Sequence, residues 1–217
     1  MLKIVIGNKN YSSWSMRAWL ALKHTGASFE EVMVPLDTPA TAEGIAKYSP
    51  AGKVPVLIDG DLTISDSLAI CEYLNERMPL AKLWPEDRRA RAIARSISAE
   101  MHSGFQALRT DCTMKIKARF EARQQRPEVL ADVARISQLL SETRKQYGRG
   151  GPYLFGSFTI ADAFFAPVAS RVKTYSLPVT PAALDYLEAL WVSPPVKAWV
   201  DGALAETLEV PRYEQQK

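Results

Sequence analysis

The sequence predicts an α+β domain with a mixed sheet, followed by an all-α domain. Short apolar runs alternate with helical patterns over residues 1–78. The Asp59-Gly60 pair joins two of those runs, and such a pair is typical of a hairpin turn. Beyond Pro79 only helical periodicity recurs. We therefore expect one domain at residues 1–78, a linker at 79–86 and a second domain at 87–217, within a length that allows two small domains.

Each element of the first domain has a local signal. Residues 2–6 form a short apolar run that suits a buried strand. Ser12, Ser13 and Ser15 offer N-cap oxygens to a helix at residues 15–23. The remaining elements are, in order, a strand at residues 29–34, a weaker helix at 40–48, strands at 54–58 and 62–64, and a helix at 67–77. A hairpin that closes such a β-α-β unit gives a mixed sheet with helices packed on it.

The second domain is predicted from apolar residues that recur at three- and four-residue spacing. One stripe at residues 90–108 predicts a first long helix, and another at 129–140 predicts a second. His102 falls on the polar side of the first stripe, which leaves the cleft, the surface and the domain interface open as its place. Three more helices are expected to begin near Thr159, near Pro181, and near Pro194 or Pro195, since proline suits a first helical turn.

Composition excludes several classes of protein. The 217 residues carry 27 basic and 24 acidic side chains, a net charge of +3. No apolar run reaches the roughly 18 to 20 residues that span a bilayer, and no cleavage site follows the opening apolar stretch. The two cysteines, Cys71 and Cys112, fit a reducing cytoplasm and, with only two histidines, predict no metal. Basic residues at 88–126 lack interleaved aromatics, so we expect no nucleic-acid partner. Since no apolar run is long enough to span a bilayer, we also expect no membrane association.

Three segments of the first domain carry residues suited to chemistry. Residues 12–17, Ser-Ser-Trp-Ser-Met-Arg, lie at a predicted helix start, where the helix dipole stabilises anions. Helix capping is the simpler interpretation of these serines. In the second segment Pro55 precedes an apolar run. A cis Val54–Pro55 bond would turn the Val54 backbone outward to pair with an extended peptide, whereas a trans bond at a strand start is the commoner alternative.

A third segment, residues 65–70, begins another helix. The Ser67 hydroxyl and nearby backbone N–H groups suit a carboxylate, and Asp66 suits an ammonium group, although capping alone would explain both residues. Together the three segments offer a hydroxyl, a free backbone edge and a clamp for a carboxylate and an amine. Such a site suits a short zwitterionic peptide.

The order and spacing of these motifs resemble the cytosolic glutathione S-transferase family, most closely its zeta class, which includes maleylacetoacetate isomerases. The likeness extends over nearly the whole chain, and six motifs in order carry it. They are the Ser-Ser-x-Ser-x-Arg motif at 12–17, Pro-x-x-x-Val-Pro at 50–55, Asp-Ser-Leu-Ala-Ile at 66–70, Leu-x-Pro-x-Asp at 83–87, Gly-x-Gln-x-Leu at 104–108, and Thr-x-Ala-Asp at 159–162.

The resemblance implies a thioredoxin-like N-terminal domain, glutathione as co-substrate without a metal, and a cytoplasmic homodimer. Ser12 or Ser13 would hold the glutathione sulfur. The other implied contacts are Lys53 with the glycyl carboxylate, Val54 beside a cis Pro55 with the cysteinyl backbone, Asp66 and Ser67 with the γ-glutamyl end, and Gln106 from the helical domain. A solvated surface lysine explains Lys53 equally well.

Two positions depart from the zeta pattern. Trp14 stands where zeta enzymes carry a cysteine. Thr174 stands where they carry an arginine near the second substrate, and Arg171 lies three residues earlier. Conjugation of glutathione to a small electrophile and glutathione-dependent isomerisation are therefore both open. An alternative from another class is a non-catalytic interaction protein on the same fold, similar to the stringent starvation protein that binds RNA polymerase.

Overall fold

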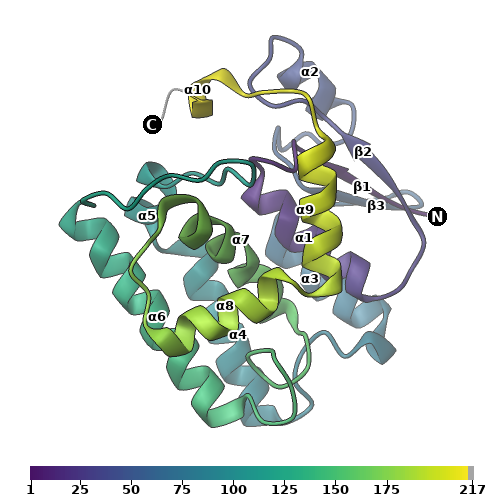
Figure 1. Ribbon diagram of the computed structural model, residues 1–217. Coiled ribbons are helices and arrows are strands. Elements are labelled where there is room, and N and C mark those ends of the chain that lie inside the picture. Colours follow the sequence, from purple (N-terminus) through teal and green to yellow (C-terminus); the bar gives the residue numbers. More distant parts are fainter. Residues whose placement is uncertain (215–217) are drawn as a thin grey trace.

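A four-stranded mixed sheet forms the N-terminal part of the computed structural model, which describes residues 1–214 (Figure 1). The strands are β1 (Leu2–Ile6), β2 (Phe29–Met33), β3 (Val56–Asp59) and β4 (Leu62–Ser65), in the order β2-β1-β3-β4. β1 runs parallel to β2 and antiparallel to β3, which forms the predicted hairpin with β4. The mixed sheet expected from the sequence is confirmed.

Helices pack against this sheet and complete the expected β-α-β-α-β-β-α order. They are α1 (Ser13–His24), α2 (Thr41–Ala46) and α3 (Ser67–Arg77), and a short 3-10 turn, η1 (Pro79–Ala81), follows them. Ser12 caps α1 and Asp66 caps α3 through their side-chain oxygens. The capping predicted for both residues is therefore present.

Within residues 88–214 every named element is a helix, and β-structure is limited to isolated bridges at 153–157. The helices are α4 (Arg88–Ser103), α5 (Gln106–Asp111), α6 (Pro127–Tyr147), α7 (Ile160–Tyr175), α8 (Pro181–Trp191), α9 (Pro194–Ala205) and α10 (Pro211–Glu214). The all-α second part is confirmed. We retain 1–78, 79–86 and 87–217 as proposed domain bounds.

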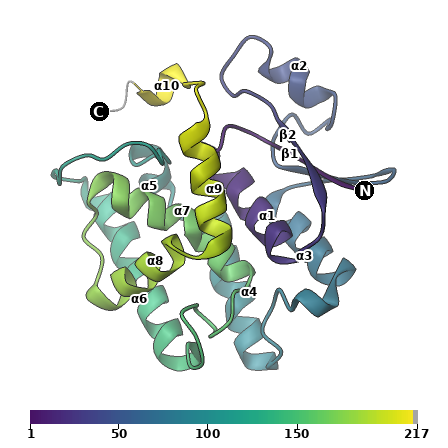
Figure 2. The ribbon, with the colours of Figure 1, turned by 45° about the vertical axis from the view of Figure 1, so that its right-hand side comes forward.

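Helix α7 is the centre of the molecule and joins its two parts. Nearly all of its residues are buried, and a capping box of Thr159 and Asp162 closes its first turn. Helix α1 packs against α7 and also lies alongside α9 (Figure 2). Because α1 belongs to the sheet layer and the other two helices to the bundle, one continuous apolar core spans both.

One predicted helix is two helices in the structure. The stripe at residues 90–108 was expected to form a single helix, but α4 ends at Ser103 and α5 begins at Gln106. Between them Phe105 has a left-handed backbone, with φ of 60°. Both helices pack against the same core, so the apolar spacing continues across the break and conceals it.

None of the helices in residues 1–214 is long and apolar enough to cross a membrane.

Candidate functional site

A pocket of about 1130 Å³ opens between the sheet layer and the helical bundle. Its volume exceeds the roughly 300–1000 Å³ typical of one small ligand, which leaves room for more than one. All seven residues that the sequence singles out line it: Ser12, Ser13, Lys53, Val54, Asp66, Ser67 and Gln106. The structure thus gathers them in one place, while their roles stay predictions.

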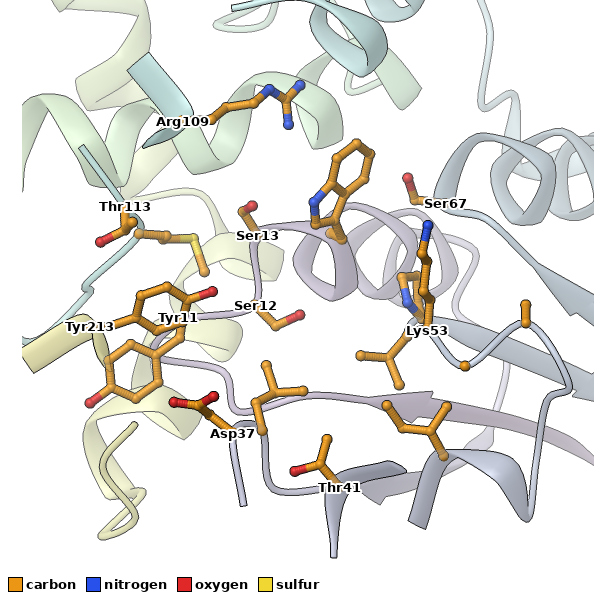
Figure 3. A pocket seen from close by; sticks show the side chains of 18 of the residues that line it. Tyr11, Ser12, Ser13, Asp37, Thr41, Lys53, Ser67, Arg109, Thr113 and Tyr213 are labelled. Carbon is orange, nitrogen blue, oxygen red and sulfur yellow. The ribbon is translucent and has the colours of Figure 1, made fainter. Parts of the chain in front are cut away.

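Ser12 and Ser13 lie at the floor of the pocket, where α1 begins. Both are buried, at 6% and 7% exposed. The Ser12 hydroxyl donates to Ser15 Oγ at 2.8 Å and accepts from the Ser15 N–H at 3.3 Å. Figure 3 shows the two hydroxyls pointing apart: Ser12 turns toward the side of Lys53, and Ser13 turns toward Arg109. One helix start therefore presents a hydroxyl to each half of the pocket.

The Lys53 half carries a carboxylate, a hydroxyl and an ammonium group. Ser67 is buried, and its Oγ has no hydrogen-bond partner within residues 1–214. Lys53 reaches toward it from the opposite wall (Figure 3). Asp66 Oδ1 accepts from the N–H groups of Leu68 and Ala69, which leaves Oδ2 to His102 and to the cation of a ligand. Since a buried unpaired hydroxyl is costly, a polar ligand group suits this position.

Val54 lies at the open end of β3, beside this half. The Val54–Pro55 bond is cis, as expected. The last pair of the β3–β4 ladder joins Val56 to Ser65. Val54 thus lies just outside the ladder and lines the pocket together with Asp66, at a place where an extended ligand would continue the sheet.

The other half of the pocket is cationic, which the sequence did not predict. Arg109 and Arg171 line it, and Arg171 Nη2 lies 3.5 Å from Ser13 Oγ, the atom to which it donates. Arg17 is fully buried behind Trp14, with its guanidinium carbon 4.5 Å from the indole centroid and that of Arg109 at 4.9 Å. Within residues 1–214 none of these arginines forms a direct ion pair with a carboxylate.

Burial and mutual repulsion act on these cations. Burial, with a contribution from Arg109, lowers the pKa of Arg171 to about 10. Burial followed by the charges of Arg109 and Arg171 holds the pKa of Arg17 well below its usual range. An anion placed among them would relieve both the desolvation and the repulsion. Arg171, which lies three residues before the position of the zeta-class arginine, is thus one of the residues that line the pocket.

Aromatic residues from both chain ends close the remaining wall. Tyr11 stacks on Tyr213 with ring centroids 5.5 Å apart, and its hydroxyl donates to Glu214 at 2.7 Å. Burial and this hydrogen bond raise the pKa of Tyr11 to about 12. The phenol of Tyr11 is thus held by Glu214, whereas the Ser12 and Ser13 hydroxyls face the pocket from the start of α1. No local pattern marked Tyr213, because its place depends on the path of the whole chain.

Residues 1–214 hold no group of three His, Cys, Asp or Glu side chains that could bind a metal ion. His102 also lines the pocket, at the contact of α4 with Asp66, one of the places that the sequence left open.

Comparison with known proteins gives consistent matches over most of the chain. The model of the glutathione S-transferase N-terminal domain matches residues 11–77, and that of the C-terminal domain matches residues 91–202. The maleylacetoacetate isomerase of Rattus norvegicus is 32% identical over 198 residues, which cover 85% of this chain and 88% of that protein. A probable maleylacetoacetate isomerase of Caenorhabditis elegans is 30% identical, over 78% of each chain.

Solved structures agree. A glutathione transferase homolog from Burkholderia, crystallised with bound glutathione, superposes with a TM-score of 0.70 and 28% identity, over 94% of this chain and 99% of that one. A bacterial maleyl pyruvate isomerase of the zeta class, at 22% identity and a TM-score of 0.68, covers 95% of this chain and 100% of that one and shows the shared fold.

Proposed function

The chain belongs to the glutathione S-transferase family, and on that premise we propose that it is an enzyme that activates the glutathione thiol with Ser12 and directs it at an anionic electrophile. One observation carries the proposal. A single pocket joins a helix start with two hydroxyls, an unpaired Ser67 hydroxyl, and two arginines that form no ion pair within residues 1–214.

Glutathione fits the Lys53 half of the pocket. Its γ-glutamyl end carries an ammonium and a carboxylate, for which Asp66 Oδ2 and the Ser67 hydroxyl are available. Its cysteinyl backbone is extended and suits the strand end at Val54. Lys53, which points toward Ser67 in this structure, would turn its flexible side chain to the glycyl carboxylate at the other end of the peptide. Gln106, at the first turn of α5, would close over the peptide from the bundle. The bound glutathione in the Burkholderia homolog supports this assignment.

The serine acts as a hydrogen-bond donor. A free thiol has a pKa near 8.5, so little thiolate exists at neutral pH. Lowering that pKa by about two units requires about 2.7 kcal/mol of differential stabilisation. One charge-assisted hydrogen bond from Ser12 and the dipole of α1 together supply such an amount. The Ser12 hydroxyl would turn from Ser15 to the sulfur, because a hydroxyl has a single rotatable proton.

The second substrate is proposed to carry a carboxylate. Arg109 and Arg171 face the half of the pocket above Ser13, and a carboxylate there would take the place of the missing counterion. Two relatives are named as isomerases of maleylacetoacetate, and this compound is a dicarboxylate. Both addition of the thiolate to an unsaturated acid and transient addition followed by isomerisation use this arrangement. Trp14, which stands at the position of the zeta-class cysteine, contacts Arg17 and Arg109 through its indole ring and so helps to hold Arg109 in place.

A matched pair of electrophiles tests the charge selectivity. We expect the wild type to prefer an unsaturated 4-oxo acid over its methyl ester in kcat/KM. Arg171→Gln should lower kcat/KM for the acid by about 10- to 150-fold, the value of one charge-assisted hydrogen bond, and the ester by far less. Arg171→Lys should restore part of the preference. Equal losses for the acid and the ester in Arg171→Gln would contradict an anion-binding role.

The enzyme is favoured over the non-catalytic interaction protein that the sequence left open, because the pocket keeps its unpaired polar groups. We also propose a homodimer, as the resemblance implies. Light scattering should give about twice the chain mass of 24.1 kDa. A cytoplasmic location is part of the proposal, supported by two free cysteines, Cys71 and Cys112.

A further inference from the structure

His102 is the residue of the helical bundle that contacts the carboxylate of Asp66. His102 Nε2 lies 3.2 Å from Asp66 Oδ2, across the boundary between α4 and the start of α3. That oxygen is the one left over by helix capping, since Oδ1 accepts from Leu68 and Ala69. Any cation that binds Asp66 from the pocket therefore shares Oδ2 with the imidazole.

The orientation of Asp66 depends on few contacts. Its backbone lies at φ 79°, a region that side-chain-bearing residues rarely adopt, and its side chain is 49% exposed. The cap fixes one carboxylate oxygen, and His102 is the neighbour of the other. We propose that His102 is a positioning residue, which holds Asp66 for the ammonium group of glutathione while neutral and competes with that ammonium when protonated. This inference rests on the proposed binding of glutathione.

The surroundings of His102 favour the neutral imidazole. Burial is the largest influence and lowers its pKa, and the charges of Arg17 and Arg109 act in the same direction against that of Asp66. The Nδ1 atom is buried without a partner in the described residues. The groups that face the ring are Trp14 edge-on at 5.2 Å and Arg17, both from α1, Asp66 before α3, Arg109 from α5, and Phe164 from α7 at 6.0 Å.

Protonation changes the balance of charge at Asp66. While His102 is neutral, the carboxylate keeps its charge for a ligand. Below the lowered pKa the imidazolium neutralises Oδ2 from the bundle side, so a ligand ammonium gains less. Binding of the peptide should thus weaken on acidification from pH 7.5 to 5.0, a range in which the amine and carboxylates of glutathione keep their charges.

S-methylglutathione is the probe, because it lacks the thiol whose ionisation would add its own pH dependence. Calorimetry at pH 7.5 and 5.0 should show the wild-type Kd rising about 3- to 10-fold at the lower pH. His102→Gln keeps a polar side chain without a titratable charge and should bind within about twofold of wild type at pH 7.5 and lose most of the pH effect. His102→Phe should weaken binding at both pH values.

The chain offers a matched control in its only other histidine, His24. His24 stacks on Phe158 away from the pocket, and burial lowers its pKa too. His24→Gln should keep the full wild-type pH effect. Failure of S-methylglutathione to bind the wild type would overturn the proposed function. Tight binding with the same pH dependence in His102→Gln would overturn the positioning role alone.

Discussion

Ser12 and Ser13 are neighbours in the chain, yet their hydroxyls serve opposite halves of the pocket. The Ser12 hydroxyl faces the peptide half, and the Ser13 hydroxyl faces the arginines (Figure 3). Ser13 Oγ accepts from Arg171, which makes it a part of the anion-binding half. Because Ser12 also caps α1, its removal has a structural and a chemical consequence that must be measured separately.

The two serines are separated by Ser12→Gly and Ser13→Ala. Glycine costs a helix cap only a few tenths of a kcal/mol, so Ser12→Gly removes the hydroxyl with little loss of stability. We expect kcat to fall about 10- to 150-fold, because one hydrogen bond to the thiolate is lost. The apparent thiol pKa in the pH–rate profile should rise. Ser13→Ala should leave that profile unchanged, and wild-type turnover in both variants would refute thiol activation by either serine.

At the scale of elements, the break between α4 and α5 places both Gln106 and Arg109 in the pocket. Arg109 turns back and donates to the carbonyls of Gly104 and His102 at 2.8 and 3.2 Å, which caps the end of α4. Apolar periodicity could not predict this break, since both helices bury the same stripe. By contrast, the strands and the caps at Ser12 and Asp66 could be predicted, because their signals lie within a few residues.

Gly104 permits the chain to turn between α4 and α5. Its replacement tests whether this turn places Arg109 in the pocket. A Cβ at this position would lie 2.8 Å from the carbonyl oxygen of Glu100, which belongs to the helix backbone and cannot rotate away. Gly104→Ala should therefore destabilise the protein by about 1–3 kcal/mol. Because Arg109 depends on this turn, KM for the anionic substrate should rise while the Kd for S-methylglutathione changes little.

Gly202→Ala is the control for Gly104→Ala. Its Cβ would lie 2.8 Å from Cδ of Lys9, a side chain that can shift more readily than a backbone carbonyl, although its ammonium pairs with Glu31. Thermal denaturation should show a smaller loss of Tm than in Gly104→Ala, since a side chain yields more than a backbone carbonyl and alanine favours a helix interior. If Gly104→Ala denatured at the same temperature as Gly202→Ala, the close approach to Glu100 would not limit the turn.

At the scale of the whole molecule, the C-terminal end holds the loop that carries Ser12. Glu206 accepts from the N–H groups of Lys9 and Asn10, at 2.6 and 3.1 Å. In both ribbon views α10 lies beside the loop before α2, and Arg212 approaches Asp37 there (Figures 1 and 2). These contacts join residues that are nearly two hundred positions apart in the chain. Local sequence patterns therefore indicated the residues of the peptide half of the pocket but not the aromatic wall of Tyr11 and Tyr213.

Glu206→Ala tests whether the C-terminal end keeps the catalytic loop in place. The change removes the acceptor of two backbone donors, each partly buried, and should cost about 1–3 kcal/mol. For a chain of this length each kcal/mol corresponds to about 2–4 °C in Tm. Since Ser12 directly follows the loosened loop, kcat should fall more than the affinity for S-methylglutathione, to which Val54, Asp66 and Ser67 contribute.

Glu209→Ala removes the same charge three residues later, from an exposed side chain. The Tm and kcat of Glu209→Ala should match those of the wild type. This control separates the effect of a changed net charge from the effect of losing the Glu206 contacts. Equal Tm and kcat in Glu206→Ala and Glu209→Ala would show that the loop of Ser12 holds its place without the C-terminal end. A fall in kcat confined to Glu206→Ala would show that the contacts of Glu206 with Lys9 and Asn10 keep the Ser12 hydroxyl in position at the thiol.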